Sequence, residues 1–278
     1  MMKKSLVLIV VVMLSGCSIK MAYNNLDRMI KWGVSDYVDL NSAQEDVLEQ
    51  ELERIHTWHR RNHLPQYAQL MRTLAQQSVD EISPARMREV SDQFEFWFDE
   101  MEEKFTPLII EIMVSLTDEQ MVALPEKMKT SNAEWAEAEA EKTVAESQKE
   151  WAEGLEGIMK NFTGRLNSDQ KAYIARRSLE YRPERVMWAN YRSRFQDDLF
   201  ALLQNRKSAE FPAAYRELIA VRDSYWGDEL KEVFEHNENL NMDVTSHVLS
   251  NLTPKQSERL VDSLTDLSED LDDLSQQT

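Results

Sequence analysis

The sequence contains little that breaks a polypeptide chain or cross-links it. Its 278 residues include only 6 Gly, 7 Pro and 1 Cys. So few Gly and Pro argue against an all-β sandwich and against a Gly-rich nucleotide-binding α/β fold, because both need many turns. A single Cys excludes an intramolecular disulfide and a zinc site built from Cys. The sequence also has no Gly-x-Ser-x-Gly, phosphate-loop or His-Glu-x-x-His motif. We therefore expect no enzyme and no cofactor.

Basic residues and long apolar runs are also scarce. The chain has 32 Lys and Arg against 50 Asp and Glu, which gives a formal net charge of −18. Phosphate groups would be repelled, so nucleic acid is not an expected partner. After the first 16 residues no apolar run is long enough for a transmembrane helix. Alternation of polar and apolar residues is also missing, which predicts that the chain forms no sheet.

The first seventeen residues have the pattern of an export signal. Two Lys precede an unbroken apolar run from Leu6 to Leu14, which is too short to span a bilayer. The run ends in Leu-Ser-Gly-Cys, and Cys17 is the only Cys of the chain. This segment resembles the lipobox of bacterial lipoproteins, which implies cleavage between Gly16 and Cys17 and attachment of diacylglycerol and palmitate to Cys17. Because Ser18 stands where Asp would retain a lipoprotein in the inner membrane, the resemblance implies the outer membrane of a Gram-negative bacterium, periplasmic leaflet.

Helical periodicity covers almost all of the remaining chain. Apolar residues recur at steps of three and four in 42–62, 84–114 and 132–162. Ser83 before a proline supplies an N-cap for the second of these segments, and Pro107 should kink or split it. We predict an all-α fold, an elongated bundle of about eight to ten helices, several of them long, with no sheet.

This pattern also predicts the domain organisation. No segment in the middle of the chain has the composition of a flexible linker, and a division into two sub-bundles near residue 165 stays open. The predicted parts are a lipoprotein signal peptide (1–16), the lipidated cysteine with a short tether (17–23), a single helical domain (24–268) and an acidic disordered tail (269–278).

Four segments share the pattern Leu, Thr or Asn, two variable residues, Gln. They begin at Leu40, Leu116, Leu166 and Leu252. The Thr or Asn fits an N-cap, and the Gln three residues later fits the return bond of a capping box, so we expect four capped helix starts. Leu-Thr-x-x-Gln also resembles the signature of periplasmic helical proteins of the Spy and CpxP type, which implies the same compartment and helical style.

A second resemblance covers more of the chain. Tyr-Asn-Asn-Leu-Asp at 23–27 precedes Trp-His-Arg at 58–60, and Leu-Pro-x-Tyr follows at 64–67. In this order and spacing the chain resembles a family of uncharacterised, all-helical proteobacterial lipoproteins. The resemblance implies a helical lipoprotein and no particular activity.

Three histidines are the strongest candidates for metal binding. His56, His59 and His63 lie at i, i+3 and i+7 on one helical face, and the last two could share a metal ion. Apolar residues occupy the same face, and Arg60 stands where a zinc protease has Glu. We therefore favour histidines of a helix interface and expect no metal site.

A basic segment and an acidic segment follow one another. Residues 165–194 contain eight basic and three acidic residues, whereas 134–156 contains eight acidic and two basic residues. One interpretation is that the two segments pack together within the fold. The other is a patch for anionic lipid or lipopolysaccharide headgroups, or for a partner, made by Arg176, Arg177, Arg182 and Arg185.

The sequence thus indicates a location more clearly than an activity. We expect a lipid-anchored protein of the cell envelope that acts through contacts with unidentified envelope proteins, in assembly or as a chaperone-like factor. The alternatives are a carrier of a ligand or metal and a module that binds lipid or lipopolysaccharide headgroups.

Overall fold

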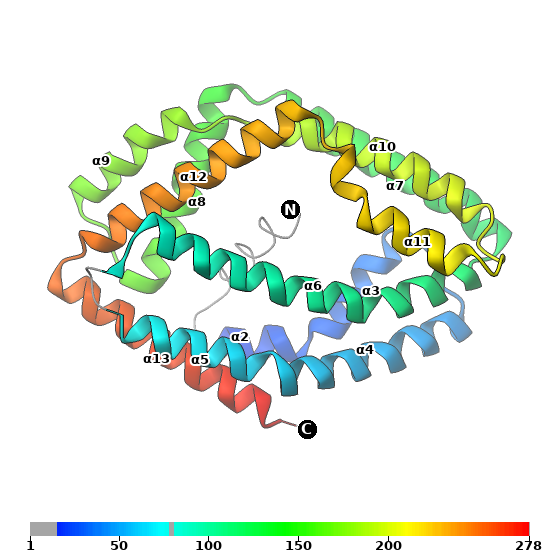
Figure 1. Ribbon diagram of the computed structural model, residues 1–278, viewed down its shortest axis with the longest axis horizontal. Helices are drawn as coiled ribbons and strands as arrows, with labels where there is room; N and C mark the ends of the chain where they lie inside the picture. Colours follow the sequence, from blue (N-terminus) through cyan, green and yellow to red (C-terminus); the bar gives the residue numbers. More distant parts are fainter. Residues whose placement is uncertain (1–15, 78–80, 278) are drawn as a thin grey trace.

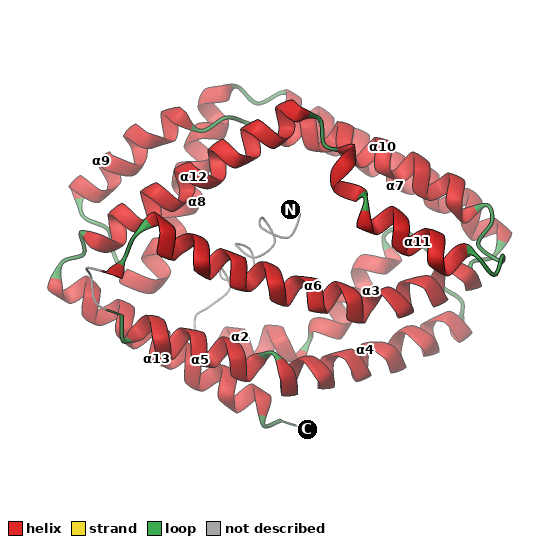
Figure 2. Cartoon of the chain, in the orientation of Figure 1, coloured by secondary structure: helices red, strands yellow, loops and turns green. Residues whose placement is uncertain are grey.

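The computed structural model describes residues 16–77 and 81–277, which form helices joined by short connections (Figures 1 and 2). No strand occurs in these residues, so the predicted all-α class with several long helices is confirmed. None of the described helices has the length and apolarity needed to cross a membrane. The helices are α2 (Gly16–Asn24), α3 (Leu26–Ser35), α4 (Ser42–Asn62), α5 (Leu64–Ala75), α6 (Pro84–Ser115), α7 (Asp118–Ala140), α8 (Val144–Thr163), α9 (Ser168–Arg177), α10 (Arg185–Leu203), α11 (Phe211–Ala220), α12 (Asp228–Ser250) and α13 (Pro254–Ser275), with short 3₁₀ turns η2 (Ser178–Glu180) and η3 (Arg222–Tyr225).

The helices run around the margin of an elongated molecule (Figure 1). Helices α4, α5 and α13 form one long side, α7 and α10 run side by side on the opposite flank, and α8, α9 and α12 complete the circuit. The apolar core is accordingly divided into five clusters rather than gathered in one centre. The most extensive helix pair joins α13, near the end of the chain, to α5, which closes the circuit.

The four predicted capping boxes are confirmed. The N-caps are Asn41, Thr117, Asn167 and Thr253, and each bonds reciprocally with the Gln three residues later. Each Gln side chain therefore satisfies an N-cap amide that the helix itself leaves without a partner. These boxes begin α4, α7, α9 and α13.

The capping glutamines also join the helix starts in pairs, which the sequence did not predict. Gln44 and Gln120 exchange two amide hydrogen bonds of 3.0 and 2.8 Å, and both side chains are buried. Gln44 Nε2 also donates to the carbonyl of Ser115, and Gln120 Nε2 to that of Asp39. Every polar atom of the two amides thus has a partner, which a buried polar pair requires.

The second pair repeats this arrangement at the other end of the molecule. Gln170 and Gln256 exchange bonds of 3.1 and 2.9 Å and reach the carbonyls of Asn251 and Arg165. Helices α4 and α7 start at one tip of the molecule in Figure 1, and α9 and α13 start at the opposite tip. The four motifs therefore form two clamps, which we call the glutamine clamps.

The predicted tether at 17–23 is wrong, because these residues belong to α2. Lys20 Nζ contacts carboxylate oxygens of Asp270 at 2.8 Å and Asp273 at 2.7 Å. Ile19 contributes to the apolar cluster shared by α5 and α13. The segment is ordered because α13 offers it both carboxylates and an apolar surface.

The predicted disordered tail at 269–278 is also wrong for most of its length, since α13 continues to Ser275. Leu271 and Leu274 are buried against α5, and the side chain of Leu274 is fully covered. Arg72 of α5 pairs with Asp272 at 2.6 Å. The composition of the tail is acidic, but its leucines recur at helical spacing and have a neighbouring helix to pack on.

Two further predictions about helix boundaries change. Helix α6 continues through Pro107, so the predicted split does not occur, and the hydroxyl of Thr106 donates to the carbonyl of Glu102. The periodic segment 132–162 is divided between α7 and α8, because Thr143 and Glu146 start a new helix with a capping box of their own. The possible division near residue 165 falls between α8 and α9, where Gly164 has a φ of 75° that favours glycine.

Candidate functional site

A partly buried polar cluster, with His63 as its most buried member, lies where α2, α3, α4, α5 and α6 meet. We call it the histidine–tyrosine cluster. It contains Tyr23, Asp27, His56, His59, His63, Tyr67 and Glu100. The local sequence places it there because α4 ends at Asn62 and α5 begins at Leu64, with Pro65 in its first turn. Proline is tolerated at that position but cannot continue the preceding helix, so the chain turns at His63.

Four of these side chains and Glu100 form a continuous line of contacts. The Tyr23 hydroxyl lies 2.8 Å from His59 Nδ1, and His59 Nε2 lies 3.3 Å from the Tyr67 hydroxyl. The Tyr67 hydroxyl lies 3.2 Å from His63 Nδ1, and His63 Nε2 lies 3.3 Å from Glu100 Oε2. The line therefore links α2 to α6 through both α4 and α5.

The carboxylate of Glu100 favours one direction for the hydrogen bonds. Its 3.3 Å contact with His63 Nε2 lacks hydrogen-bond geometry, but a carboxylate favours a proton on the nitrogen that faces it. A neutral His63 protonated on Nε2 accepts at Nδ1 from the Tyr67 hydroxyl. Tyr67 has then used its single proton and accepts from His59 Nε2, which leaves His59 Nδ1 to accept from Tyr23. In this arrangement each donor from Tyr23 to His63 meets one acceptor, and both imidazoles and both hydroxyls are neutral.

Burial favours these neutral forms. Together with smaller contributions from charge repulsion by His63 and His56, it lowers the pKa of His59 to about 3. Burial also lowers the pKa of His63, whose side chain is only 1% exposed, although Glu100 opposes that shift. It raises the pKa of both tyrosine hydroxyls, Tyr23 and Tyr67. An imidazole with a pKa near 3 is a weak base at neutral pH. The low basicity of His59 therefore favours a structural role, in which the cluster connects helices, over acid–base catalysis.

A side branch of the cluster holds α3. Asp27 Oδ1 lies 2.9 Å from His56 Nδ1, and the rings of His56 and Tyr23 are 4.5 Å apart. Burial lowers the pKa of His56, and Asp27 opposes the shift. Arg60 extends its guanidinium over the Tyr23 ring and donates to Asn24 at 2.7 Å. The first two described helices are thus attached to α4 by a carboxylate–imidazole contact, ring contacts and hydrogen bonds.

The three histidines predicted as the strongest metal candidates, His56, His59 and His63, do come together in this cluster. Both ring nitrogens of His59 and of His63, and Nδ1 of His56, lie against tyrosine hydroxyls or carboxylates. Within the part of the chain that the structure describes, no three His, Cys, Asp or Glu side chains are placed to hold a metal ion. The geometry supports the interface interpretation.

Sequence reasoning missed Tyr67 and Glu100 as partners of the histidines. The available signal was the second family resemblance, since the residues that carry it are the ones that meet here. Tyr23 bonds to His59, Asn24 to Arg60, and Tyr67 lies between two histidines. A motif divided over 23–67 is therefore one spatial cluster.

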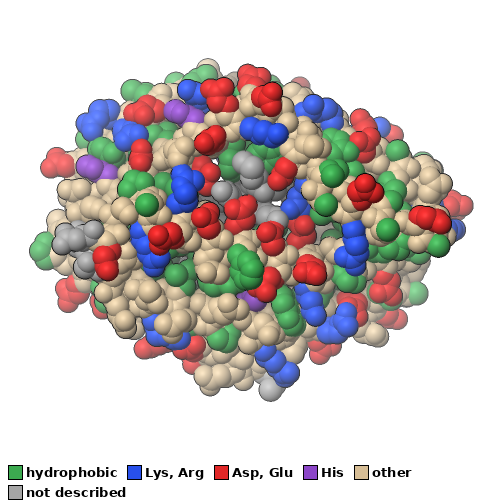
Figure 3. Space-filling model, in the orientation of Figure 1, with side chains coloured by type: hydrophobic (Ala, Val, Ile, Leu, Met, Phe, Trp, Pro, Cys, Tyr) green, Lys and Arg blue, Asp and Glu red, His purple; other side chains and the backbone are tan. Residues whose placement is uncertain are grey.

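The predicted basic patch has partners within the chain. Arg177 contacts Glu180 and the Tyr173 hydroxyl, and Arg182 contacts Glu232. Arg176 lies over the Tyr173 ring. The face of the molecule shown in Figure 3 has acidic and basic side chains interspersed rather than a continuous basic surface.

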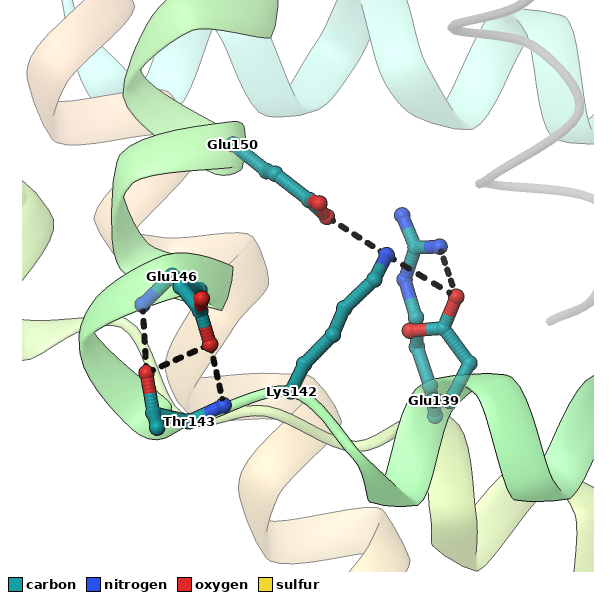
Figure 4. A network of polar contacts seen from close by, with 6 residues as sticks. Glu139, Lys142, Thr143, Glu146 and Glu150 are labelled. Atoms are coloured by element: carbon teal, nitrogen blue, oxygen red, sulfur yellow. Dashed lines mark hydrogen bonds and ion pairs between the residues drawn. The ribbon is translucent and has the colours of Figure 1, made fainter.

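Arg185 contacts Glu139 of a polar network at the junction of α7 and α8, in which Figure 4 labels Glu139, Lys142 and Glu150. Its guanidinium lies 3.1 Å from Glu139, and Lys142 contacts the same carboxylate and that of Glu150. Lys171 of α9 pairs with Glu156 of α8 at 3.3 Å. The Arg185–Glu139 and Lys171–Glu156 pairs join the basic segment to the acidic segment, which favours packing within the fold over a headgroup patch.

The fold and the cluster define a helical protein whose first described helices, α2 and α3, are joined to its body by a partly buried polar network. Residues 36–231 match a family of unknown function, DUF6279, and the chain belongs to this family. The expectation of an uncharacterised all-helical family is therefore confirmed. No curated protein and no solved structure matches the chain. The matched range includes the histidines, Tyr67 and Glu100.

Proposed function

We propose that the mature chain is a lipid-anchored protein of the outer membrane that faces the periplasm. In this proposal it acts by binding other envelope proteins, in assembly or as a chaperone-like factor, and catalyses no reaction. One observation carries the anchor: the chain's single cysteine, Cys17, ends the Leu-Ser-Gly-Cys sequence that follows a short apolar run.

The position of α2 supports an anchor with a defined place on the protein. Cys17 lies in the first turn of α2, and its side chain lies outside the described residues. Lys20, one turn later, is bound to α13, and Tyr23 is bound to His59. A lipid on Cys17 would therefore hold the body of the protein close to the membrane.

Exposed apolar side chains away from α2 support action through protein contacts. Val144 and Leu179 are both exposed and line a shallow hollow together with Tyr181 and His236. Apolar side chains beside a hollow are typical of surfaces that bind another protein. This hollow is the part of the described surface where we expect a partner.

Metabolic labelling with radioactive palmitate tests the anchor. We expect label on the wild-type chain and none on Cys17→Ala, because the thiol is the attachment point. Ser18→Ala is the matched control, since it changes the next residue and keeps the thiol. Equal labelling of the wild type and Cys17→Ala would contradict the anchor.

Site-specific photo-crosslinking in intact cells tests the protein contacts. A crosslinking amino acid at position 179 should give adducts with envelope proteins, whereas one at Lys149, which is exposed on a polar face of α8, should give few. Leu179→Glu combined with a crosslinker at 144 should remove the adducts, because a charge in the contact opposes burial. Equal adducts at 149 and 179 would contradict a specific contact.

A further inference from the structure

Helix α3 presents an apolar face to solvent. It contains no buried residue, which sets it apart from α4 to α13. Trp32 is 73% exposed and Met29 is 48% exposed, and Met21 at the preceding α2 is 68% exposed. Three large apolar side chains within twelve residues are thus exposed to solvent, which needs an explanation.

The exposed face is held outward by the opposite side of the same helix. Ile30 and Val34 pack against the apolar cluster of α4 and α6, and Asp27 pairs with His56. At 100° per residue, Met29 and Trp32 project from the side opposite Ile30 and Val34. Their exposure is therefore a consequence of how α3 is fixed to the body.

The charge of this segment differs from that of the whole chain. Residues 18–35 contain three basic residues, Lys20, Arg28 and Lys31, and one acidic residue, Asp27. The whole chain has a net charge of −18. Lys20 pairs with Asp270 and Asp273, and Lys31 pairs with Glu49, so the body of the protein compensates these two cations. Exposed apolar side chains that include a Trp are typical of a helix face that lies in a membrane interface.

We propose that the outward face of α2 and α3, made by Met21, Met29 and Trp32, lies in the interfacial layer of the lipid bilayer. This inference rests on the proposed anchor, because Cys17 precedes Met21 by one helical turn, about 6 Å along the axis. Trp favours the interface because its ring is apolar and its N–H stays hydrated. Together with the lipid, the face would fix the orientation of the body on the membrane.

Fluorescence quenching by brominated lipid tests this placement. The mature lipid-bearing chain is purified from membranes and reconstituted in vesicles of phosphatidylethanolamine and phosphatidylglycerol whose acyl chains carry bromine near the headgroup. We expect bromine to quench part of the tryptophan emission of the wild type, and Trp32→Phe to remove most of that quenching. The other six tryptophans should keep their emission, because they belong to other parts of the fold.

A double variant and a control test the rest of the face. Met21→Ser with Met29→Ser should reduce the quenching of Trp32, since the face loses apolar area. Val122→Ser on α7, another exposed apolar position, should leave it unchanged. Quenching that is equal in the wild type and Trp32→Phe would overturn the proposal. Absence of quenching in the wild type would also overturn the proposal. Crosslinks from a photoreactive residue at position 32 to a protein or to a second copy would then identify what covers the face instead.

The result of the quenching experiment can be distinguished from the result for lipid attachment at Cys17. Mass spectrometry of the same purified chain shows whether lipid is attached to Cys17. Attached lipid with unquenched Trp32 overturns the membrane-facing surface and leaves the anchor intact. A purified chain without lipid on Cys17 contradicts the anchor. That chain is then added to the brominated vesicles, and quenching of Trp32 shows whether the face binds lipid by itself.

Discussion

At the scale of single residues, Tyr67 has the most demanding position in the histidine–tyrosine cluster. Its one hydroxyl bonds to His59 and His63 at the same time, and its ring contacts Trp97 with centroids 4.5 Å apart. Removing the hydroxyl would leave a donor on one histidine and an acceptor on the other without partners. Such a loss is more costly than the loss of one exposed hydrogen bond.

We therefore expect Tyr67→Phe to lower the free energy of unfolding by about 1–3 kcal/mol. Tyr37→Phe is the matched control, because Tyr37 is exposed and its hydroxyl makes only a 3.5 Å contact with Ser131. That control should change stability by less than about 0.5 kcal/mol. Urea unfolding followed by circular dichroism measures both, and equal stability of the two variants would show that the line of hydrogen bonds contributes nothing.

The same residues predict a dependence of stability on pH. The pKa of His59 is lowered from 6.5 to about 3 in the folded chain, so the unfolded chain binds more protons between these values. The free energy of unfolding should therefore fall as the pH decreases from about 6.5 towards 3. Burial lowers the pKa values of His56 and His63 as well, and their contribution has the same sign.

Urea midpoints at pH 7.5 and pH 5.0 measure this effect. The wild type should have a lower midpoint at pH 5.0. His59→Gln should show a smaller difference between the two pH values, because Gln does not titrate. A difference as large in His59→Gln as in the wild type would assign the pH dependence to other groups.

At the scale of helices, the glutamine clamps show how one motif serves two purposes. Gln256 caps its own helix through Thr253 and holds α9 through Gln170 and the carbonyl of Arg165. Because both partners are buried, replacing one Gln leaves polar atoms of the other without hydrogen bonds.

We expect Gln256→Leu to cost about 2–3 kcal/mol of unfolding free energy. In the double variant with Gln170→Leu, the second substitution should cost less than it does alone, because the two side chains share their hydrogen bonds. Gln276→Leu, at the exposed C-cap of α13, is the control. Additive effects of the two substitutions would contradict a clamp.

Helix α13 supplies the second prediction at this scale. Leu274 is fully buried although it lies in a segment of acidic composition. Leu274→Ala should therefore cost about 2–5 kcal/mol. Leu179→Ala, on an exposed leucine, should have little effect on the same urea unfolding curve. If Leu274→Ala were as mild as Leu179→Ala, the end of α13 would not be packed on α5 in solution.

At the scale of the whole molecule, several small cores and two clamps replace a single central core. The clamps lie at opposite tips, α13 closes the circuit against α5, and the histidine–tyrosine cluster attaches α2 and α3 (Figure 1). With the proposed anchor at Cys17, the histidine–tyrosine cluster would connect the membrane-attached helices α2 and α3 to the rest of the molecule.

The location of the molecule follows from the residue after the anchor in our proposal. Ser18→Asp should move the protein from the outer to the inner membrane, because Asp at that position resembles a retention signal. Ser18→Ala should leave it in the outer membrane. Density-gradient separation of the two membranes measures the distribution, and an unchanged distribution of Ser18→Asp would contradict sorting by this residue.

The sequence by itself determined the fold class and the helix starts. Helical periodicity, the scarcity of Gly and Pro, and the Thr or Asn with Gln three residues later are local properties, so they predict the all-α class and the four capping boxes without knowledge of neighbours. The interface interpretation of the three histidines also came from local pattern, since apolar residues share their face.

Only the tertiary structure decided what each element packs against. Acidic composition alone made 269–278 look disordered, because the surface of α5 that covers Leu274 lies about 200 residues earlier in the chain. Gln44 and Gln120 form a pair although 76 residues separate them, and Tyr23 meets His59 across 36 residues. Hydrogen bonds and burial depend on distance in space, and periodicity along the chain carries no information about which distant residues will meet.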